Sequence, residues 1–381
     1  MISIDFKKFD TINIIGFNAP EWHFANFGAI LAGGIAAGVY ATNGPDACKY
    51  QANHSEAKVI VCEGVKQLEK YYAISKSLKH LKALVIYGPD SVPADIKSKT
   101  SVPVYTFADF LKLGANVPDS TLKAVADDQK PNEVTTLIYT SGTTGPPKAV
   151  MLTHDNVTWT AQAQLSTMAP LTNDDHIISY LPLSHIAAQM IDMHAPMMAG
   201  AQVWFAQPDA LRGSLGATLK EVRPTIFFGV PRVWEKIYGK MQEVAKSTTG
   251  IKKKISTWAK KKSTTYWNNH QFGGNQKSPF MFGLASKLLG KVRVALGLDR
   301  VSFVFCFYNY KFDFFSINYF ISPTSSMCLY LICSVLLVTY QLLQLTLKSS
   351  NTLLQSTSQS LNYSVNLSAL VLILPILQTL G

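Results

Sequence analysis

The chain has 381 residues and a formal net charge of +11, and this length allows two to three domains around a large core. Its five cysteines form no Cys-x-x-Cys pair and no regular framework, which argues against a disulfide-stapled secreted domain. The basic residues show neither the aromatic interleaving nor the zinc spacing that is typical of nucleic-acid binding, so we expect no nucleic-acid partner.

Strands and helices alternate through the first part of the chain. Apolar runs predict strands over 11–16, 59–62 and 83–87, and helical spacing predicts helices over 21–34 and 66–81. This rhythm predicts an α/β fold with a doubly wound sheet. Residues 119–132 are polar and are interpreted as a connection, so 1–132 forms the first predicted domain.

A loop rich in hydroxyl groups and glycine follows a predicted buried strand over 134–139. Its hydroxyl residues are Thr140, Ser141, Thr143 and Thr144, and its glycines are Gly142 and Gly145. The glycines allow tight turns, backbone N–H groups and hydroxyls can donate to an anion, and Lys148 adds a point charge. The loop is therefore predicted to bind a polyphosphate, although no Gly-Lys-Ser/Thr makes it a Walker A motif. The alternative is an ordinary polar hairpin turn.

A second α/β unit is predicted within residues 133–300. A helix is expected over 155–168 with His154 and Asp155 as its N-terminal caps, and strands are expected over 177–181, 202–205 and 225–228. Residues 263–280 are interpreted as a surface loop and 286–298 as a short basic amphipathic helix. Two lysine triplets, at 252–254 and 260–262, stand about two helical turns apart. They favour either peripheral contact with an anionic membrane or acyl-CoA phosphates, or a solvated helix face.

The phosphate loop resembles the signature of the adenylate-forming enzymes, which include acyl-CoA synthetases, luciferases and peptide-synthetase adenylation domains. Three further segments resemble the long-chain acyl-CoA synthetases of the bubblegum type: Ile15-Gly-Phe-Asn-Ala-Pro-Glu-Trp22, Ser179-Tyr-Leu-Pro-Leu-Ser-His-Ile186 and Gly229-Val-Pro-Arg-Val-Trp-Glu-Lys236. The resemblance covers about residues 9–300. It departs from the family at Ala149, which stands where the family usually has glycine and whose methyl is expected to crowd the loop.

The resemblance implies a long-chain fatty-acid–CoA ligase. Such an enzyme uses ATP and Mg²⁺ to turn a fatty-acid carboxylate into an acyl-adenylate, which the thiol of coenzyme A then attacks. By resemblance, residues 140–145 and Lys148 hold the β- and γ-phosphates, and Lys148 and His185 are the catalytic candidates. His185 also lies beside the acyl pocket, together with Tyr180, Arg232 and Trp234. The alternatives are that His185 caps the following helix and that Tyr180 and Trp234 belong to the core.

Residues 301–381 differ in composition from the rest of the chain. Their only charged residues are Lys311, Asp313 and Lys348, and their only glycine is Gly381. A globular domain carries about 25% charged residues and about 7% glycine. The stretch 327–347 has no charge and is long enough to span a membrane. Read one base out of register, 356–374 permits a string similar to the family's Gly-x-Ser-Glu segment, so 301 to about 333 is interpreted as translated intron.

The change in composition at residue 301 leaves two functions to consider. The chain is expected to be an incomplete ligase with little or no acyl-CoA synthesis, because 301–381 shows neither the magnesium-holding glutamate nor the ribose-binding aspartate nor the lysine of the C-terminal lid domain. The alternative is a catalytically inactive lipid- or nucleotide-binding protein attached to membrane through 327–347. The chain start lacks a signal-peptide core, so we expect a cytoplasmic location, with peripheral contact at the endoplasmic reticulum or other membranes.

Overall fold

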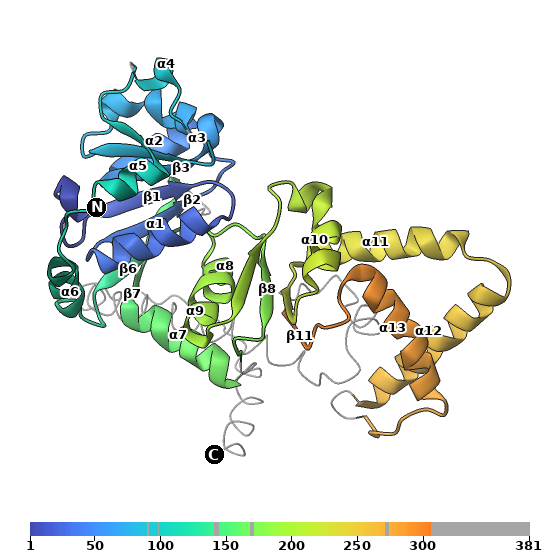
Figure 1. Cartoon of the computed structure of the whole chain (residues 1–381). Coiled ribbons are helices and arrows are strands. Elements are labelled where there is room, and N and C mark those ends of the chain that lie inside the picture. Colours follow the sequence, from blue (N-terminus) through green and yellow to red (C-terminus); the bar gives the residue numbers. More distant parts are fainter. Residues whose placement is uncertain (90, 98, 141–144, 168–170, 271–273, 306–381) are drawn as a thin grey trace, which may run out of the picture. The chain divides into compact units, whose positions relative to one another are not determined.

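A seven-stranded sheet organises the first part of the protein in the computed structural model (Figure 1). The structure describes residues 1–305 apart from 90, 98, 141–144, 168–170 and 271–273. The strand order is β5-β4-β3-β1-β2-β6-β7, and neighbours pair in parallel except for the antiparallel β6 and β7. The strands are β1 (Thr11–Ile15), β2 (Ile35–Val39), β3 (Ala57–Glu63), β4 (Ala83–Tyr87), β5 (Val104–Thr106), β6 (Val134–Thr140) and β7 (Lys148–Thr153).

A smaller, four-stranded parallel sheet follows, in the order β11-β10-β8-β9. Its strands are β8 (His176–Ser179), β9 (Gln202–Phe205), β10 (Ile226–Phe228) and β11 (Phe303–Phe305). The α/β class with a largely parallel sheet, which the strand–helix rhythm predicts, is therefore confirmed. The division into domains at residues 132 and 300 stays a prediction.

Helices connect the parallel strands of the first sheet, and in both parts of the chain several helices begin at a proline. Pro20, Pro45 and Pro231 stand at the first turn of their helices, where the missing N–H costs no hydrogen bond. The α-helices up to the end of β9 are α1 (Pro20–Leu31), α2 (Pro45–His54), α3 (Gly64–Tyr72), α4 (Ala94–Lys97), α5 (Phe107–Lys112), α6 (Asp119–Asp127), α7 (His154–Thr167), α8 (Ile186–Gln189) and α9 (Ala195–Ala199). The remaining ones are α10 (Leu215–Val222), α11 (Pro231–Ser247), α12 (Gly250–His270) and α13 (Phe282–Leu296).

Both faces of the seven-stranded sheet are buried. In β3, Val59 and Val61 belong to one core cluster, whereas Ile60 and Cys62 belong to another. This alternation places successive side chains on opposite faces. Helices α1 and α5 contribute to the first cluster, and α2 and α3 contribute to the second. Burial on both sides explains why these strands appear in the sequence as continuous apolar runs.

Three expectations about where helices and loops lie are wrong. The polar connection over 119–132 contains helix α6, which buries none of its side chains. The surface loop expected over 263–280 is helical as far as His270, because Tyr266 stacks on His270 and on Phe282 with ring centroids 3.9 and 3.8 Å apart. The helix expected over 66–81 ends at Tyr72 and is followed by a short 3₁₀ turn.

Within the described part of the chain, no helix is both long enough and apolar enough to cross a bilayer. The stretch 327–347 and the frame-shifted string lie outside the described residues, and so does the proposed intron apart from residues 301–305.

Candidate nucleotide and acyl site

The predicted phosphate loop connects the two strands of an antiparallel hairpin. Thr140 ends β6, Lys148 begins β7, and the two residues are paired across the hairpin. Both side chains are exposed, whereas the preceding five residues of β6 are buried. This hairpin, formed by β6, β7 and the loop between them, thus presents a hydroxyl and an ammonium group side by side at the carboxyl end of β6. We call it the phosphate hairpin. Ser141, Gly142, Thr143 and Thr144 lie outside the described residues, so their part in phosphate binding stays a prediction.

Gly145 adopts a backbone conformation that favours glycine. Its φ is +94°, in the region that L side chains rarely adopt, although a Cβ there would meet nothing within 4 Å. The requirement for glycine is therefore conformational rather than steric. Ala149, in contrast, lies within β7 opposite Tyr139, where it packs in a small apolar cluster with Leu137.

Helix α2 holds both ends of this loop, an arrangement that sequence reasoning missed. The Tyr50 hydroxyl donates to the carbonyl of Pro147 over 3.0 Å. His54 Nδ1 lies 2.9 Å from the hydroxyl of Tyr139, and the rings of Tyr50 and His54 stack at 5.4 Å. Burial raises the pKa of Tyr139 to about 12, so this hydroxyl keeps its proton. These partners are 85 to 97 residues apart, and no local pattern links them.

His185 sits in a segment that packs against the same sheet. A Cβ on Gly38 in β2 would come within 2.7 Å of the Cα of Ser184, so the glycine permits this close approach. β2 is the neighbour of β6, and Gly38 lies near its carboxyl end. Ligands of open α/β sheets bind at the carboxyl ends of the strands. The fold therefore brings the His185 segment and the phosphate hairpin to the same edge of the sheet.

The His185 side chain caps helix α8, which is the structural alternative considered for it. The backbone N–H of Ala187 donates to His185 Nδ1 over 3.2 Å. Desolvation lowers the pKa of this imidazole, so the ring is neutral at pH 7 and its Nδ1 can accept. The residue as a whole is exposed, so desolvation of the imidazole is only partial. Capping through Nδ1 leaves Nε2 for another contact, so a role toward substrate stays a prediction.

A buried polar chain joins the two sheets beside this edge. The Asn18 amide, just after β1, donates to the Ser179 hydroxyl at 2.7 Å and to the carbonyl of Leu181 at 2.8 Å. The Ser179 hydroxyl in turn donates to Asp192 Oδ2 at 2.8 Å. Burial raises the pKa of Asp192 to about 8, so the carboxyl group is largely protonated at neutral pH. Sequence reasoning missed Asp192, although an acid between methionines in an apolar run is a visible signal.

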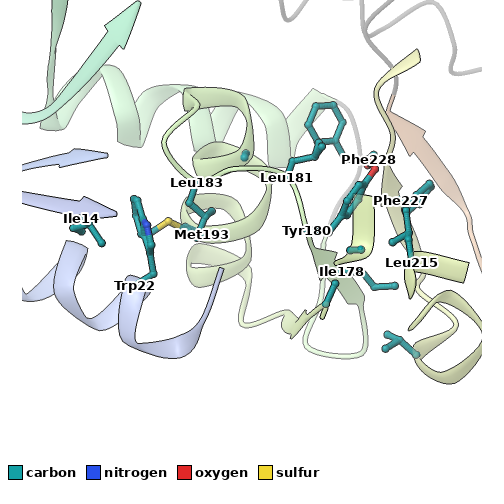
Figure 2. Packing of buried hydrophobic residues seen from close by; sticks show 14 of the residues in the cluster. Ile14, Trp22, Ile178, Tyr180, Leu181, Leu183, Met193, Leu215, Phe227 and Phe228 are labelled. Carbon is teal, nitrogen blue, oxygen red and sulfur yellow. Dashed lines mark hydrogen bonds between the residues drawn. The ribbon is translucent and has the colours of Figure 1, made fainter. Parts of the chain in front are cut away.

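Tyr180 and Trp234, which are predicted to bind substrate, are core residues in the structure. Tyr180 stacks on Phe227 at 5.7 Å and donates its hydroxyl to the carbonyl of Phe228 over 2.6 Å (Figure 2). Trp234 is fully buried, packs edge-on against Phe227 and donates its indole N–H to the carbonyl of Gly229 over 3.0 Å. Their polar atoms are thus engaged within the protein, and their acyl contacts stay a prediction.

The remaining candidates lie on helix starts or on the surface. Arg232 is exposed in the first turn of α11. Thr153 and Asn156 cap α7 reciprocally, with N–H···O distances of 3.1 and 3.2 Å. The expectation that His154 and Asp155 cap this helix is therefore wrong, because both lie inside its first turn. Among the described residues, no group of three or more His, Cys, Asp or Glu side chains is placed to hold a metal ion.

Known proteins with similar sequences identify the family to which this architecture belongs. Residues 1–299 match the family model of the AMP-binding enzymes. The chain is 48% identical over 303 residues to the long-chain-fatty-acid–CoA ligase ACSBG2 of Xenopus laevis, covering 78% of this chain and 40% of that protein. It is 47% identical to human long-chain-fatty-acid–CoA ligase ACSBG1, covering 78% and 41%. The chain thus spans about 40% of the length of the curated relatives it matches.

A solved structure with the same fold is the A-PCP didomain of carboxylic acid reductase from Segniliparus rugosus, determined in complex with AMP. It superposes with a TM-score of 0.59 at 19% identity and covers 80% of this chain and 43% of that one. This likeness supports the fold alone. The family model covers well over half of the sequence and includes the hairpin, the His185 segment and both sheets up to β10. The chain belongs to the family of AMP-binding enzymes.

Proposed function

We propose that this chain is part of a long-chain fatty-acid–CoA ligase and supplies its phosphate-binding and acyl-site elements. The observation that carries the proposal is the hairpin, which places the Thr140 hydroxyl, the left-handed Gly145 and the Lys148 ammonium around one loop. Relatives at 45–48% identity are named as ligases of this class. The substrates are ATP, a long-chain fatty acid and coenzyme A.

In the proposed reaction, a fatty-acid carboxylate attacks the α-phosphate of ATP, which gives acyl-adenylate and pyrophosphate. The acid is already ionised near pH 7, so this step needs stabilisation of phosphate charge rather than a general base. Mg²⁺ bound to the phosphates would neutralise part of that charge. Lys148 and Thr140 donate to the β- and γ-phosphates, and neutral His185 orients the acyl group. Attack of the coenzyme A thiol on the acyl carbon then releases AMP.

The alternative function is a nucleotide- or lipid-binding protein without ligase activity. One observation favours it: residues 301–381 contain no glutamate to serve as the family's magnesium ligand. We further propose domains over 1–132 and 133–300, with 301–381 as a segment foreign to the family. The proposed location is cytoplasmic, with peripheral membrane contact through residues 252–262.

The proposal is tested by the affinity of the chain for ATP. Replacing Lys148 with alanine removes a charge-assisted contact of about 1.5–3 kcal/mol. The Lys148→Ala variant should therefore bind ATP about 10- to 150-fold more weakly in isothermal titration calorimetry. Lys66→Ala is the matched control, because Lys66 is an exposed lysine on α3. Equal affinities of the Lys148→Ala variant and the unsubstituted chain would refute the phosphate-binding role of the hairpin.

A further inference from the structure

The positive charge of the molecule is concentrated in one segment. Residues 1–249 contain 22 basic and 22 acidic side chains and are neutral as a whole. Residues 250–300 contain eleven basic side chains and one acidic side chain, Asp299. Asp299 forms an ion pair with Arg223, the residue that follows α10, so it does not offset the lysines of α12. The net charge of this segment is +10, and helix α12 carries six of its lysines and no acid.

Helix α12 presents three of these lysines on a grooved face. A groove of about 660 Å³ is lined by Gly250, Lys253, Lys254, Thr257, Trp258 and Lys261. We call this set the basic face of α12. The spacing of three and four residues brings these side chains to one side of the helix. Within the described part of the chain, no carboxylate forms an ion pair with Lys253, Lys254 or Lys261.

An apolar stripe runs along the edge of the basic face. Ile251, Ile255 and Trp258 follow the i, i+4, i+7 spacing of one helical stripe. Ile251 is 77% exposed and Ile255 is 45% exposed, and Trp258 is partly buried. Two residues before the neighbouring helix α13, Phe280 is 82% exposed. Large apolar side chains exposed beside lysines are typical of helices that lie in a membrane interface.

The opposite side of α12 is already occupied. Ala259 and Ser263 are buried, and Tyr266 stacks on Phe282 of α13 at 3.8 Å. Tyr266 also stacks on His270, so both of its ring faces are engaged and cannot stack on nucleic-acid bases. The exposed side of α12 therefore combines lysines with isoleucines. This chemistry fits the phosphates and upper acyl region of a lipid bilayer better than it fits a nucleic acid.

We propose that the basic face of α12, with Ile251 and Ile255, docks onto the surface of a bilayer that contains anionic phospholipid. The lysines contact lipid phosphates, and the isoleucines enter the interface between headgroups and acyl chains. This inference develops the membrane contact of the proposed function by assigning the lipid class and the contacting side chains. It does not depend on ligase activity.

The test is flotation of the full chain with lipid vesicles at 0.1 M salt. Vesicles of 70% phosphatidylcholine and 30% phosphatidylserine should bind the chain more tightly than pure phosphatidylcholine. The triple variant Lys253→Gln/Lys254→Gln/Lys261→Gln should lose about 100-fold in binding to the anionic vesicles, because each lysine near such a surface contributes about 1 kcal/mol. Ile251→Ser/Ile255→Ser should weaken binding to the same vesicles without changing the preference for phosphatidylserine.

The matched control is Lys49→Gln/Lys66→Gln/Lys79→Gln, which removes the same charge from exposed lysines outside the segment. It should bind vesicles as the unsubstituted chain does. Equal losses in the two triple variants, or equal binding to both kinds of vesicle, would overturn the proposal. So would binding of a single-stranded oligonucleotide that depends on the three lysines while vesicle binding does not. ATP calorimetry on the same samples reports the proposed function separately, since α12 is remote in sequence from the phosphate hairpin.

Discussion

Individual side chains in this protein show how one environment shifts ionisation in opposite directions for acids and bases. Asp192 is fully buried, and desolvation raises its pKa to about 8. In the same region His194 is buried and His23 is half-buried, and desolvation lowers both pKa values to about 4. In each case the neutral form is favoured, because burial penalises charge. The three groups should therefore give the stability of the fold a distinct pH dependence.

We predict that stability is greatest near pH 6.5. Between about pH 4 and 6.5 the unfolded histidines hold protons that the folded ones lack, so their contribution to stability rises with pH. Asp192 acts in the opposite sense, because the folded carboxyl holds a proton that the unfolded one has lost. Above about pH 6.5, only Asp192 among these groups still binds a different number of protons in the folded and unfolded states. Stability should then fall by about 1.4 kcal/mol per pH unit until about pH 8.

Urea unfolding of Asp192→Asn between pH 6.5 and 8 checks this prediction. The amide keeps an oxygen that can accept from Ser179, and it does not titrate. Its free energy of unfolding should stay level over this range while that of the unsubstituted chain declines. Asp46→Asn, at an exposed position in α2, should decline as the unsubstituted chain does. A parallel decline in Asp192→Asn would show that another group causes the pH dependence.

Among the elements, sequence reasoning identifies strands that are buried on both faces. It misses elements that are largely exposed and contacts between residues that are far apart in the sequence. β4 was predicted over its full length, because both of its faces are buried and every residue is apolar. β7 was missed because it lies at the edge of the sheet and only Leu152 is buried. α6 was missed because it buries nothing and its residues are polar. The loop after β6 was expected from its local pattern, whereas the second strand of the hairpin was not, and its supports in α2 depend on contacts across more than 80 residues.

The hairpin turn offers a matched pair of glycine substitutions. Gly145→Ala should lower the free energy of unfolding by about 1 kcal/mol and weaken ATP binding, because alanine disfavours a φ of +94°. Gly239→Ala, in the interior of α11, should raise stability by up to about 1 kcal/mol and leave ATP binding unchanged. A Cβ at either position would meet no atom within 4 Å, so the two differ in backbone conformation rather than in space. Urea unfolding and calorimetry measure both effects; a gain in stability from Gly145→Ala would contradict the prediction.

Taken as a whole, the molecule combines a region that matches its family with a segment of different composition. The family model ends at residue 299, and residues 301–381 carry three charged side chains. The composition of the sequence was sufficient to locate this change. The sequence did not show that Tyr180 and Trp234 use their polar atoms within the core, and their acyl contacts stay a prediction.

We predict that the 381-residue chain makes little or no acyl-CoA from radiolabelled palmitate, ATP, Mg²⁺ and coenzyme A. Under the proposed function, the phosphate hairpin would supply only part of the stabilisation of the transition state, and loss of one strong electrostatic contact typically lowers a rate by about 10²–10³. Residues 301–381 lack the glutamate of the family's Gly-x-Ser-Glu segment. A gene with the reading frame repaired, so that this segment returns, should restore synthesis. The repaired chain with Lys148→Ala is the control and should lose most of that activity. Robust turnover by the 381-residue chain would show that the absent segment is dispensable.

The attachment of the phosphate hairpin to α2 has an entropic consequence. Tyr50 holds Pro147, the last residue of the loop, and His54 holds Tyr139 before it, so one helix fixes both ends of the seven residues between Thr140 and Lys148. The chain therefore closes this loop when it folds and not when a ligand arrives. Under the proposed function, a phosphate would bind groups whose separation is already set, and the affinity lost on removing the Tyr50 hydroxyl should appear mainly as a less favourable binding entropy.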